Sequence, residues 1–308
     1  MFGKIATFEF RYQLRQPLFW VVFIVFFLLT FGSVTIDQIQ IGSGGTVHRN
    51  SPFAIAQTHL ILSLFYMFVT AAFVANVVVR DDETGFGPII RSTRVTKANY
   101  LLGRFSGGVA AAAVAYLSVP LAFFLGSLMP WVDGETLGPN RLQDYGFAYG
   151  VLALPALLLT SAVFFSVATI TRSMMATYIG VVAVLIAYLA ADGVLGSKSE
   201  FETAMAWAEP FGAGAYGLVT KYWTAAERNT LNAPLEDVLL WNRVIWTAVG
   251  AVFLAAAYAL YRPSPRGAKL KKQERLKALV EKDVAVAQVG AQPRPVYGLA
   301  SGLTQLWS

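Results

Sequence analysis

Few side chains in this 308-residue sequence are of the types and spacings that carry out chemistry. The absence of cysteine excludes thiolate metal sites and cysteine nucleophiles. The two histidines, His48 and His59, lie 11 residues apart and belong to no H-E-x-x-H motif. The stretch nearest to a phosphate-binding loop begins at Gly196 and reads Gly-Ser-Lys-Ser, which lacks the spacing G-x-x-x-x-G-K-[ST]. The sequence therefore predicts a protein that is not itself an enzyme and that holds no metal or cofactor.

The composition is typical of a membrane protein. Hydrophobic residues make up 56% of the chain and charged residues 14%, well below the quarter or so that is usual in soluble domains. A bilayer core of about 30 Å needs roughly 20 apolar residues in a helix, because no backbone group can stay unpaired in hydrocarbon. Six stretches meet this requirement and predict an all-α membrane protein with six transmembrane helices: residues 18–36, 57–79, 105–129, 147–170, 178–195 and 244–261.

Only Asp192 and His59 are potentially ionisable within these six stretches. A carboxylate inside a membrane is a candidate functional residue, and a proton-coupled carrier would need one. Asp192 lies close to the end of its span, so a solvated carboxylate is the favoured interpretation. His48 and His59 are interpreted as ordinary residues of the outer membrane interface.

The third predicted span begins with a run of small residues. Residues 106–115 are almost all Gly, Ala and Ser, a composition that lets neighbouring helices approach closely. We therefore expect tight helix packing along this run.

The basic residues determine the expected orientation. Three Lys and Arg precede the first span, five lie between the second and third, one between the fourth and fifth, and nine follow the sixth, which is 18 of the 24. The positive-inside rule then places both termini in the cytoplasm, in the inner (plasma) membrane of the cell. This placement explains the net charge of +6 without a nucleic-acid partner.

Residues 1–17 are predicted to form an interfacial elbow helix. At 100° per residue, Lys4, Arg11 and Arg15 share one narrow stripe, and Glu9 interrupts the more apolar side. Pro17 would then bend the chain into the first span. A solvated lead-in is one alternative, and a cleaved signal peptide is another, although the long apolar run without an A-x-A-like site disfavours it.

The loop between the second and third spans is the most informative segment. It reads RDDETGFGPIIRSTRVTKANYLLGR over residues 80–104, with acids at its start, an apolar pair at its centre and basic residues around them. An apolar tip rimmed by charge is typical of a docking surface. A solvated basic loop that serves topology alone is the alternative.

This order of residues resembles the coupling helix of ABC transporter permeases of the type-2 exporter class. The matching positions are the acidic start, the apolar centre and the Ser-Thr step, namely Asp82, Glu83, Gly85, Ile89, Ile90, Ser92 and Thr93. Gly87 and Pro88 stand where the family has an unbroken helical stretch. The resemblance implies that a separate cytoplasmic ATPase subunit docks on this loop and drives a pair of six-span halves, as a homodimer or a tandem or heterodimer.

Two further segments extend the resemblance. The outer stretch KYWTAAERNTLNAP, residues 221–234, is similar to permeases that are fused to an aminopeptidase-N-like zinc peptidase. Residues 263–308 form a basic linker or tail after the permease domain, 18–262, and end in an apolar aromatic run similar to the start of a second elbow helix. We therefore expect the chain to be the first half of a longer tandem permease, with any peptidase activity beyond residue 308.

The function expected from the sequence is thus a transmembrane permease subunit of an ATP-driven ABC exporter in the lipid bilayer. Two alternatives remain: a membrane anchor or scaffold for a peptidase domain, and a secondary carrier that needs no ATP. The transported substrate cannot be read from these residues.

Overall fold

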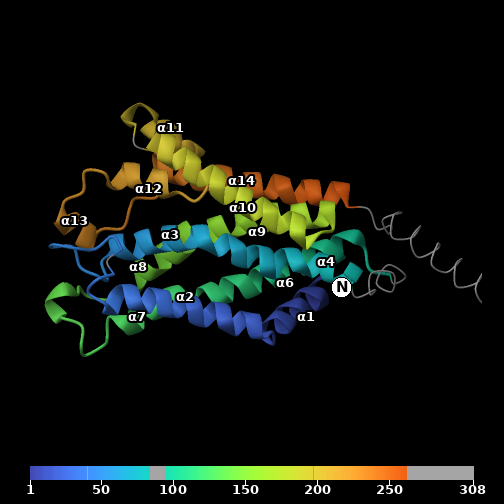
Figure 1. Cartoon of the computed structure of the whole chain (residues 1–308), viewed down its shortest axis with the longest axis horizontal. Coiled ribbons are helices and arrows are strands. Elements are labelled where there is room, and N and C mark those ends of the chain that lie inside the picture. The colour runs from blue at the N-terminus through green and yellow to red at the C-terminus, as the bar shows by residue number, and fades with distance from the viewer. Residues whose placement is uncertain (40, 84–93, 197, 262–308) are drawn as a thin grey trace, which may run out of the picture. The chain divides into compact units, whose positions relative to one another are not determined.

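The computed structural model describes residues 1–39, 41–83, 94–196 and 198–261. These described residues form an all-α bundle with six helical stretches long and apolar enough to cross a membrane (Figure 1). The chain is therefore a multi-pass membrane protein, as the hydropathy pattern predicts. The six stretches are Pro17–Thr35, Pro52–Asp81, Lys97–Gly126, Leu142–Thr171, Met174–Val194 and Asp237–Leu260.

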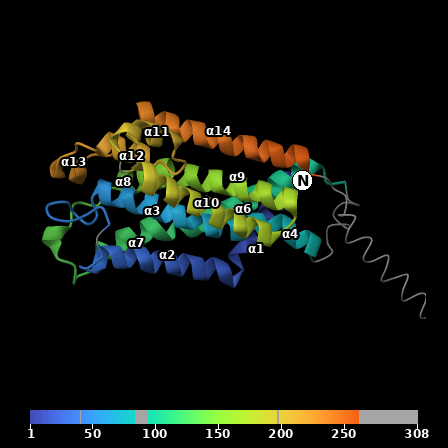
Figure 2. The same ribbon diagram turned by 45° about the horizontal axis from the view of Figure 1, so that its top comes forward.

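A short helix precedes the first spanning helix at an angle. Helix α1, Phe2–Leu14, ends at Arg15, and α2, Pro17–Thr35, begins directly after Gln16. Gln16 is extended, with φ −76° and ψ 136°, as expected for a residue before proline. Figures 1 and 2 show α1 lying obliquely at one end of the bundle, which we call the α1 end; the opposite end is the α13 end.

The second, third and fourth spanning stretches are each built from more than one helical segment. The second joins α3, Pro52–Thr70, through the π-helical η1, Ala71–Ala75, to α4, Asn76–Glu83. The third joins α6, Lys97–Tyr116, to α7, Ser118–Gly126, where Pro120 cannot donate a backbone hydrogen bond. The fourth joins α8, Leu142–Phe147, and π-helical η3, Ala148–Ala153, to α9, Leu154–Thr171.

The last two spanning stretches enclose an outer segment. Helix α10, Met174–Ala191, continues into π-helical η4, Asp192–Gly196, and α14, Asp237–Leu260, completes the bundle. Short helices lie between them at the α13 end: η5, Ser199–Phe201; α11, Glu202–Ala208; α12, Ala213–Thr220; and α13, Ala225–Thr230. A 3₁₀ turn, η2, Gly134–Thr136, lies between α7 and α8.

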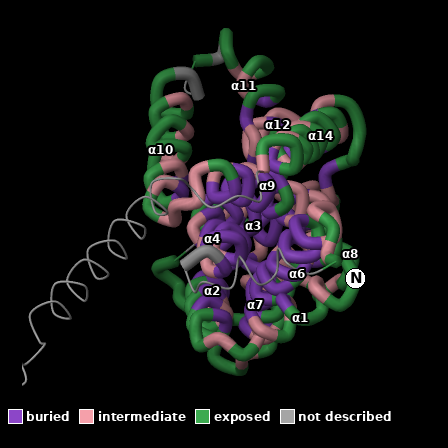
Figure 3. Tube along the Cα trace, turned by 90° about the vertical axis from the view of Figure 1, so that its right-hand side faces the viewer, coloured by how far each residue is buried: buried purple, intermediate pink, exposed green. Residues whose placement is uncertain are grey.

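The second spanning stretch forms the centre of the bundle. In its most apolar window 72% of the residues are buried, against 11% in the fifth and 17% in the sixth. Figure 3 shows the same contrast between the buried α3 and α9 and the largely exposed α10. The exposed apolar side chains of α2, α10 and α14 are therefore the surface that faces lipid.

Most of the helices extend beyond the apolar stretches predicted from sequence. The second helix starts at Pro52, because the Ser51 hydroxyl accepts a hydrogen bond from Ala54 N–H at 3.1 Å, and it continues to Glu83. The third starts at Lys97, where Thr96 caps it in the same way. Hydropathy detects only the apolar part of a helix, whereas the backbone hydrogen bonds continue through the charged residues that follow. Arg80 and Arg104 consequently lie within helices.

Candidate functional site

A cluster of buried polar side chains joins three helices at the α1 end of the bundle. Helix α1 contributes an acid and an amide, α4 an arginine and an acid, and α6 a tyrosine and an arginine. We call this set the Glu9 cluster; its members are Glu9, Gln13, Arg80, Asp81, Tyr100 and Arg104. All except Arg80 are buried, and the Glu9 side chain has no exposed surface.

Glu9 is the centre of the cluster. Its Oε2 accepts a hydrogen bond from the Arg80 guanidinium at 2.8 Å and another from Arg104. Its Oε1 accepts from Gln13 Nε2 at 3.0 Å, and the same Gln13 nitrogen donates to the Phe73 carbonyl of η1 at 3.1 Å. One carboxylate therefore fastens α1 to the end of the second spanning helix and to the start of the third.

Asp81 closes the cluster between α4 and α6. Both of its carboxylate oxygens accept from the Arg104 guanidinium, at 2.9 and 2.7 Å, and Oδ2 also accepts from the Tyr100 hydroxyl at 2.7 Å. The bidentate pairing is the geometry in which arginine binds a carboxylate most strongly. It bridges the two helices that flank residues 84–96.

The formal charges of the cluster balance, since two carboxylates face two guanidinium groups. Burial of an ion is costly unless opposite charges and hydrogen bonds compensate it. The aromatic rings around the cluster add to this compensation: the Arg80 guanidinium lies 4.1 Å from the centre of the Tyr12 ring, and Arg104 lies 5.8 Å from that of Phe8. Removing any one charge would leave its partner buried and unpaired.

Two glycines of α6 allow α1 to come this close. A Cβ atom on Gly103 would lie 2.9 Å from the Ile5 Cβ, and one on Gly107 would lie 2.6 Å from the Ala6 carbonyl oxygen. On its other side, α6 meets η1 through Gly108, where a Cβ would lie 3.3 Å from the Phe73 carbonyl. The run of small residues at 106–115 thus packs closely against its neighbours, as its composition predicts.

The docking residues predicted from the sequence lie mainly outside the described residues. Asp82 and Glu83 are the last two residues of α4, directly after the Glu9 cluster. Gly85, Ile89, Ile90, Ser92 and Thr93 all fall in the range 84–93, which the structure does not describe. The described chain resumes at Arg94 and enters α6 at Lys97, so both flanks of the predicted docking segment start from helices that carry cluster residues.

The elbow residues lie on the exposed face of α1. Lys4, Arg11 and Arg15 are all exposed. The sequence interpretation treated Glu9 as an interruption of an apolar, membrane-facing side. In the structure this side packs on α6 instead, and Glu9 is the charge that holds it there. The signal that could have revealed this is the spacing of four residues between Glu9 and Gln13, on the side opposite the basic stripe.

The remaining candidates from the sequence occupy different environments. His59 is fully buried, not at an interface: its ring lies beside Tyr116 and Phe123, and its Nδ1 lies 2.8 Å from the Ile55 carbonyl oxygen. The expectation for His59 was therefore wrong, because a helix at the centre of the bundle buries its polar residues as well. Asp192 is exposed, at the first position of η4. No group of three or more His, Asp or Glu side chains among the described residues could hold a metal ion.

A second set of buried charges lies at the α13 end. The Glu209 carboxylate accepts hydrogen bonds from the backbone N–H groups of Phe211, Gly212 and Gly214, at 2.8, 2.5 and 3.3 Å. The Arg243 guanidinium donates to the carbonyls of Phe211 and Pro210 at 2.7 and 3.1 Å. Burial raises the pKa of the Glu209 carboxyl above its ordinary value, against the opposite effect of these N–H donors and of Arg243. This set ties the turn between α11 and α12 to α14.

Comparison with known protein families gives no assignment. No family model matches the chain, and a comparison with curated proteins finds no significant relative. The geometry therefore has to carry the functional argument. The Glu9 cluster contains no nucleophile with an adjacent base, so its arrangement is suited to joining helices mechanically and not to catalysis.

Proposed function

We propose that the chain is the transmembrane permease subunit of an ATP-driven ABC exporter of the type-2 class. It would couple to a separate cytoplasmic ATPase subunit through the loop between its second and third spans. It would work in the inner (plasma) membrane with both termini in the cytoplasm, paired with a second permease half.

The observation that carries this proposal is the Glu9 cluster. A loop that transmits force must start from helices that move together, because a flexible attachment would absorb the motion. Asp81 and Arg104 connect the two helices that flank residues 84–96, and Glu9 adds the elbow helix to the same rigid unit. A docked subunit that pushed on this loop would move α1, α4 and α6 as one body.

The lengths of these helices also support the proposal. The second and third spanning stretches each have 30 residues, which corresponds to about 45 Å at 1.5 Å per residue. A bilayer core of about 30 Å leaves roughly 15 Å of each helix outside the hydrocarbon unless it tilts. The Glu9 cluster lies on the α1 ends of both helices, where the predicted loop leaves the membrane.

The proposal is tested by reversing the charge of the predicted docking residues. The double substitution Asp82→Lys/Glu83→Lys should abolish co-purification of an ATPase from native membranes in mild detergent, because like charges would face the bound subunit. Quantitative mass spectrometry of the purified protein measures the amount of ATPase recovered.

A matched double substitution, Glu135→Lys/Glu200→Lys, controls for the change in net charge, since both residues are exposed outside the spans at the α13 end. It should leave the recovery of the ATPase unchanged. Equal recovery in the two variants, or no stoichiometric ATPase with the unaltered chain, would contradict the proposal. Transport that continues without ATP would indicate the secondary carrier instead.

A further inference from the structure

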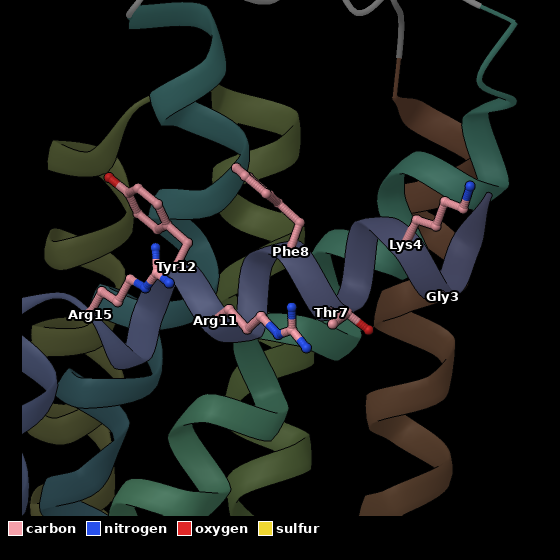
Figure 4. A pocket seen from close by; sticks show the side chains of 7 residues that line it. All are labelled: Gly3, Lys4, Thr7, Phe8, Arg11, Tyr12 and Arg15. Atoms are coloured by element: carbon pink, nitrogen blue, oxygen red, sulfur yellow. The ribbon is translucent and has the colours of Figure 1, made fainter.

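The outward face of α1 forms an open groove with a volume of about 560 Å³. Three basic side chains, two aromatic rings, a hydroxyl and a glycine line it: Gly3, Lys4, Thr7, Phe8, Arg11, Tyr12 and Arg15. Figure 4 shows the rings of Phe8 and Tyr12 on one side of the helix, and Thr7 and Arg11 on the other. The groove thus combines positive charge, a hydroxyl and apolar surface over a few turns of one helix.

The positive charge of the groove is not neutralised by the described part of the chain. Lys4, Arg11 and Arg15 make no ion pair with any residue that the structure describes. The single acid of α1, Glu9, points to the opposite side and is occupied by Arg80 and Arg104. The groove therefore offers three cationic groups to an anion from outside.

The position of the groove indicates where that anion comes from. Helix α2 begins three residues after α1 ends, and its outward residues are apolar from the first turn, with Leu18, Val21 and Val25 each more than two-fifths exposed. Exposed apolar residues on a spanning helix face the lipid chains, so the groove lies where the hydrocarbon ends and the headgroups begin. Trp20, which is 55% exposed, suits this interfacial level.

We infer that this groove binds the phosphodiester headgroup of an anionic phospholipid from the leaflet at the α1 end. Arg11 and Arg15 lie one helical turn apart, about 6 Å along the axis, and can both reach one phosphate. Lys4 lies about 10 Å further along the helix and can meet a second anionic group or a neighbouring lipid. Phe8, which is 59% exposed, offers apolar contact for the glycerol and the first acyl carbons.

The bound headgroup would act on the Glu9 cluster through shared side chains. Tyr12 lines the groove and also carries the Arg80 guanidinium on its ring. Phe8 stands in the same relation to Arg104. A lipid that fixes these two rings would hold α1 against α4 and α6. This inference requires only a membrane protein and does not depend on the proposed ATPase.

The inference is tested by lipid binding to the full chain. The substitution Arg11→Gln/Arg15→Gln should weaken the binding of phosphatidylglycerol about 25-fold, since each basic group at a membrane surface contributes a factor of about five. Native mass spectrometry measures the phosphatidylglycerol retained in competition with phosphatidylcholine. Lys198→Gln/Lys221→Gln removes the same charge from exposed positions at the α13 end and should leave retention unchanged.

Further measurements make every outcome decisive. Inorganic phosphate at millimolar concentration should not displace the lipid; displacement would show a site for free phosphate and overturn the lipid assignment. The charge-preserving substitution Arg11→Lys/Arg15→Lys should keep most of the binding. If the glutamine variant does not fold, phosphatidylglycerol with a photoreactive headgroup should crosslink to residues 3–15 of the unaltered chain. Unchanged retention in the folded glutamine variant, or crosslinks confined to other segments, would refute the inference.

Discussion

The two ends of the bundle bury charged groups in different ways. At the α1 end, Glu9 and Asp81 are bonded almost entirely by side chains from other helices, Arg80 and Arg104 among them. At the α13 end, Glu209 is bonded by three backbone N–H groups within five residues of itself. The first arrangement joins helices that are distant in sequence, whereas the second fixes the shape of one turn.

This difference teaches what each end can do. Hydrogen bonds between side chains can break and form again with a new partner when helices shift, and each helix keeps its own fold. Hydrogen bonds from a carboxylate to its own backbone are lost only if the turn itself changes conformation. We therefore expect changes in the Glu9 cluster to affect the packing of whole helices, and changes around Glu209 to act on the outer segment alone.

The largest effect is expected from Glu9. Glu9→Gln leaves Arg80 and Arg104 facing an uncharged partner in a buried site, which should lower the free energy of unfolding by about 3 to 5 kcal/mol. Denaturation in mixed micelles measures this loss. Glu135→Gln removes an exposed carboxylate and should have almost no effect.

A double-mutant cycle sharpens the same test. Glu9 and Arg80 are 2.8 Å apart, so Glu9→Gln/Arg80→Gln should cost less than the sum of the two single substitutions. Purely additive losses would mean that the two charges do not stabilise each other.

An intermediate effect is expected from Gly212, in the turn held by Glu209. Its φ is +91°, and a Cβ there would lie 2.5 Å from the Arg243 Cζ. Gly212→Ala should therefore lower the free energy of unfolding by about 2 to 3 kcal/mol, while the Glu9 cluster keeps its hydrogen-exchange protection. Gly217→Ala is the control five residues away, where a Cβ meets nothing within 4 Å and should stabilise α12 slightly. Equal effects of the two substitutions would refute the strained turn.

The smallest effect is expected at α13. The Glu227 carboxylate accepts hydrogen bonds from the Thr224 backbone and hydroxyl, at 2.7 and 2.8 Å, and these lower its pKa below the ordinary value. The folded state thus favours the ionised form, and its stabilising effect is present above the ordinary pKa and lost as the pH falls through the lowered one. Hydrogen exchange of residues 225–230, corrected for the intrinsic pH dependence, should show a small loss of protection in acid. Glu227→Gln should remove this pH dependence, and a persistent one would point to another group.

The membrane-spanning helices could be predicted from the sequence because hydrophobicity alone selects them. Their ends could not, since a helix continues through charged residues wherever a partner satisfies those charges. Arg104 is an example: it would end a span on a hydropathy scale, yet Asp81 and Glu9 allow it to lie within α6. The partners come from segments more than 20 residues away, which a window along the sequence does not see.

The candidate site was predictable only in outline. The basic stripe of α1 follows from its helical period, and the structure places Lys4, Arg11 and Arg15 on an exposed face. The buried role of Glu9 depends on the approach of α1 to Gly103 and Gly107, a tertiary contact that single-sequence patterns do not contain. The same reason explains His59, whose burial depends on α3 being central in the bundle.

The π-helical segment η1 gives the second spanning helix a rotational reserve. A π turn holds one residue more than an α turn, so converting Ala71–Ala75 to α geometry would rotate everything after it by about 100°. Arg80 and Asp81 lie within the next two turns and would be carried away from Glu9 and Arg104. The docking end of this helix is thus set like the hand of a dial, by the winding of five small and apolar residues deep inside the bundle.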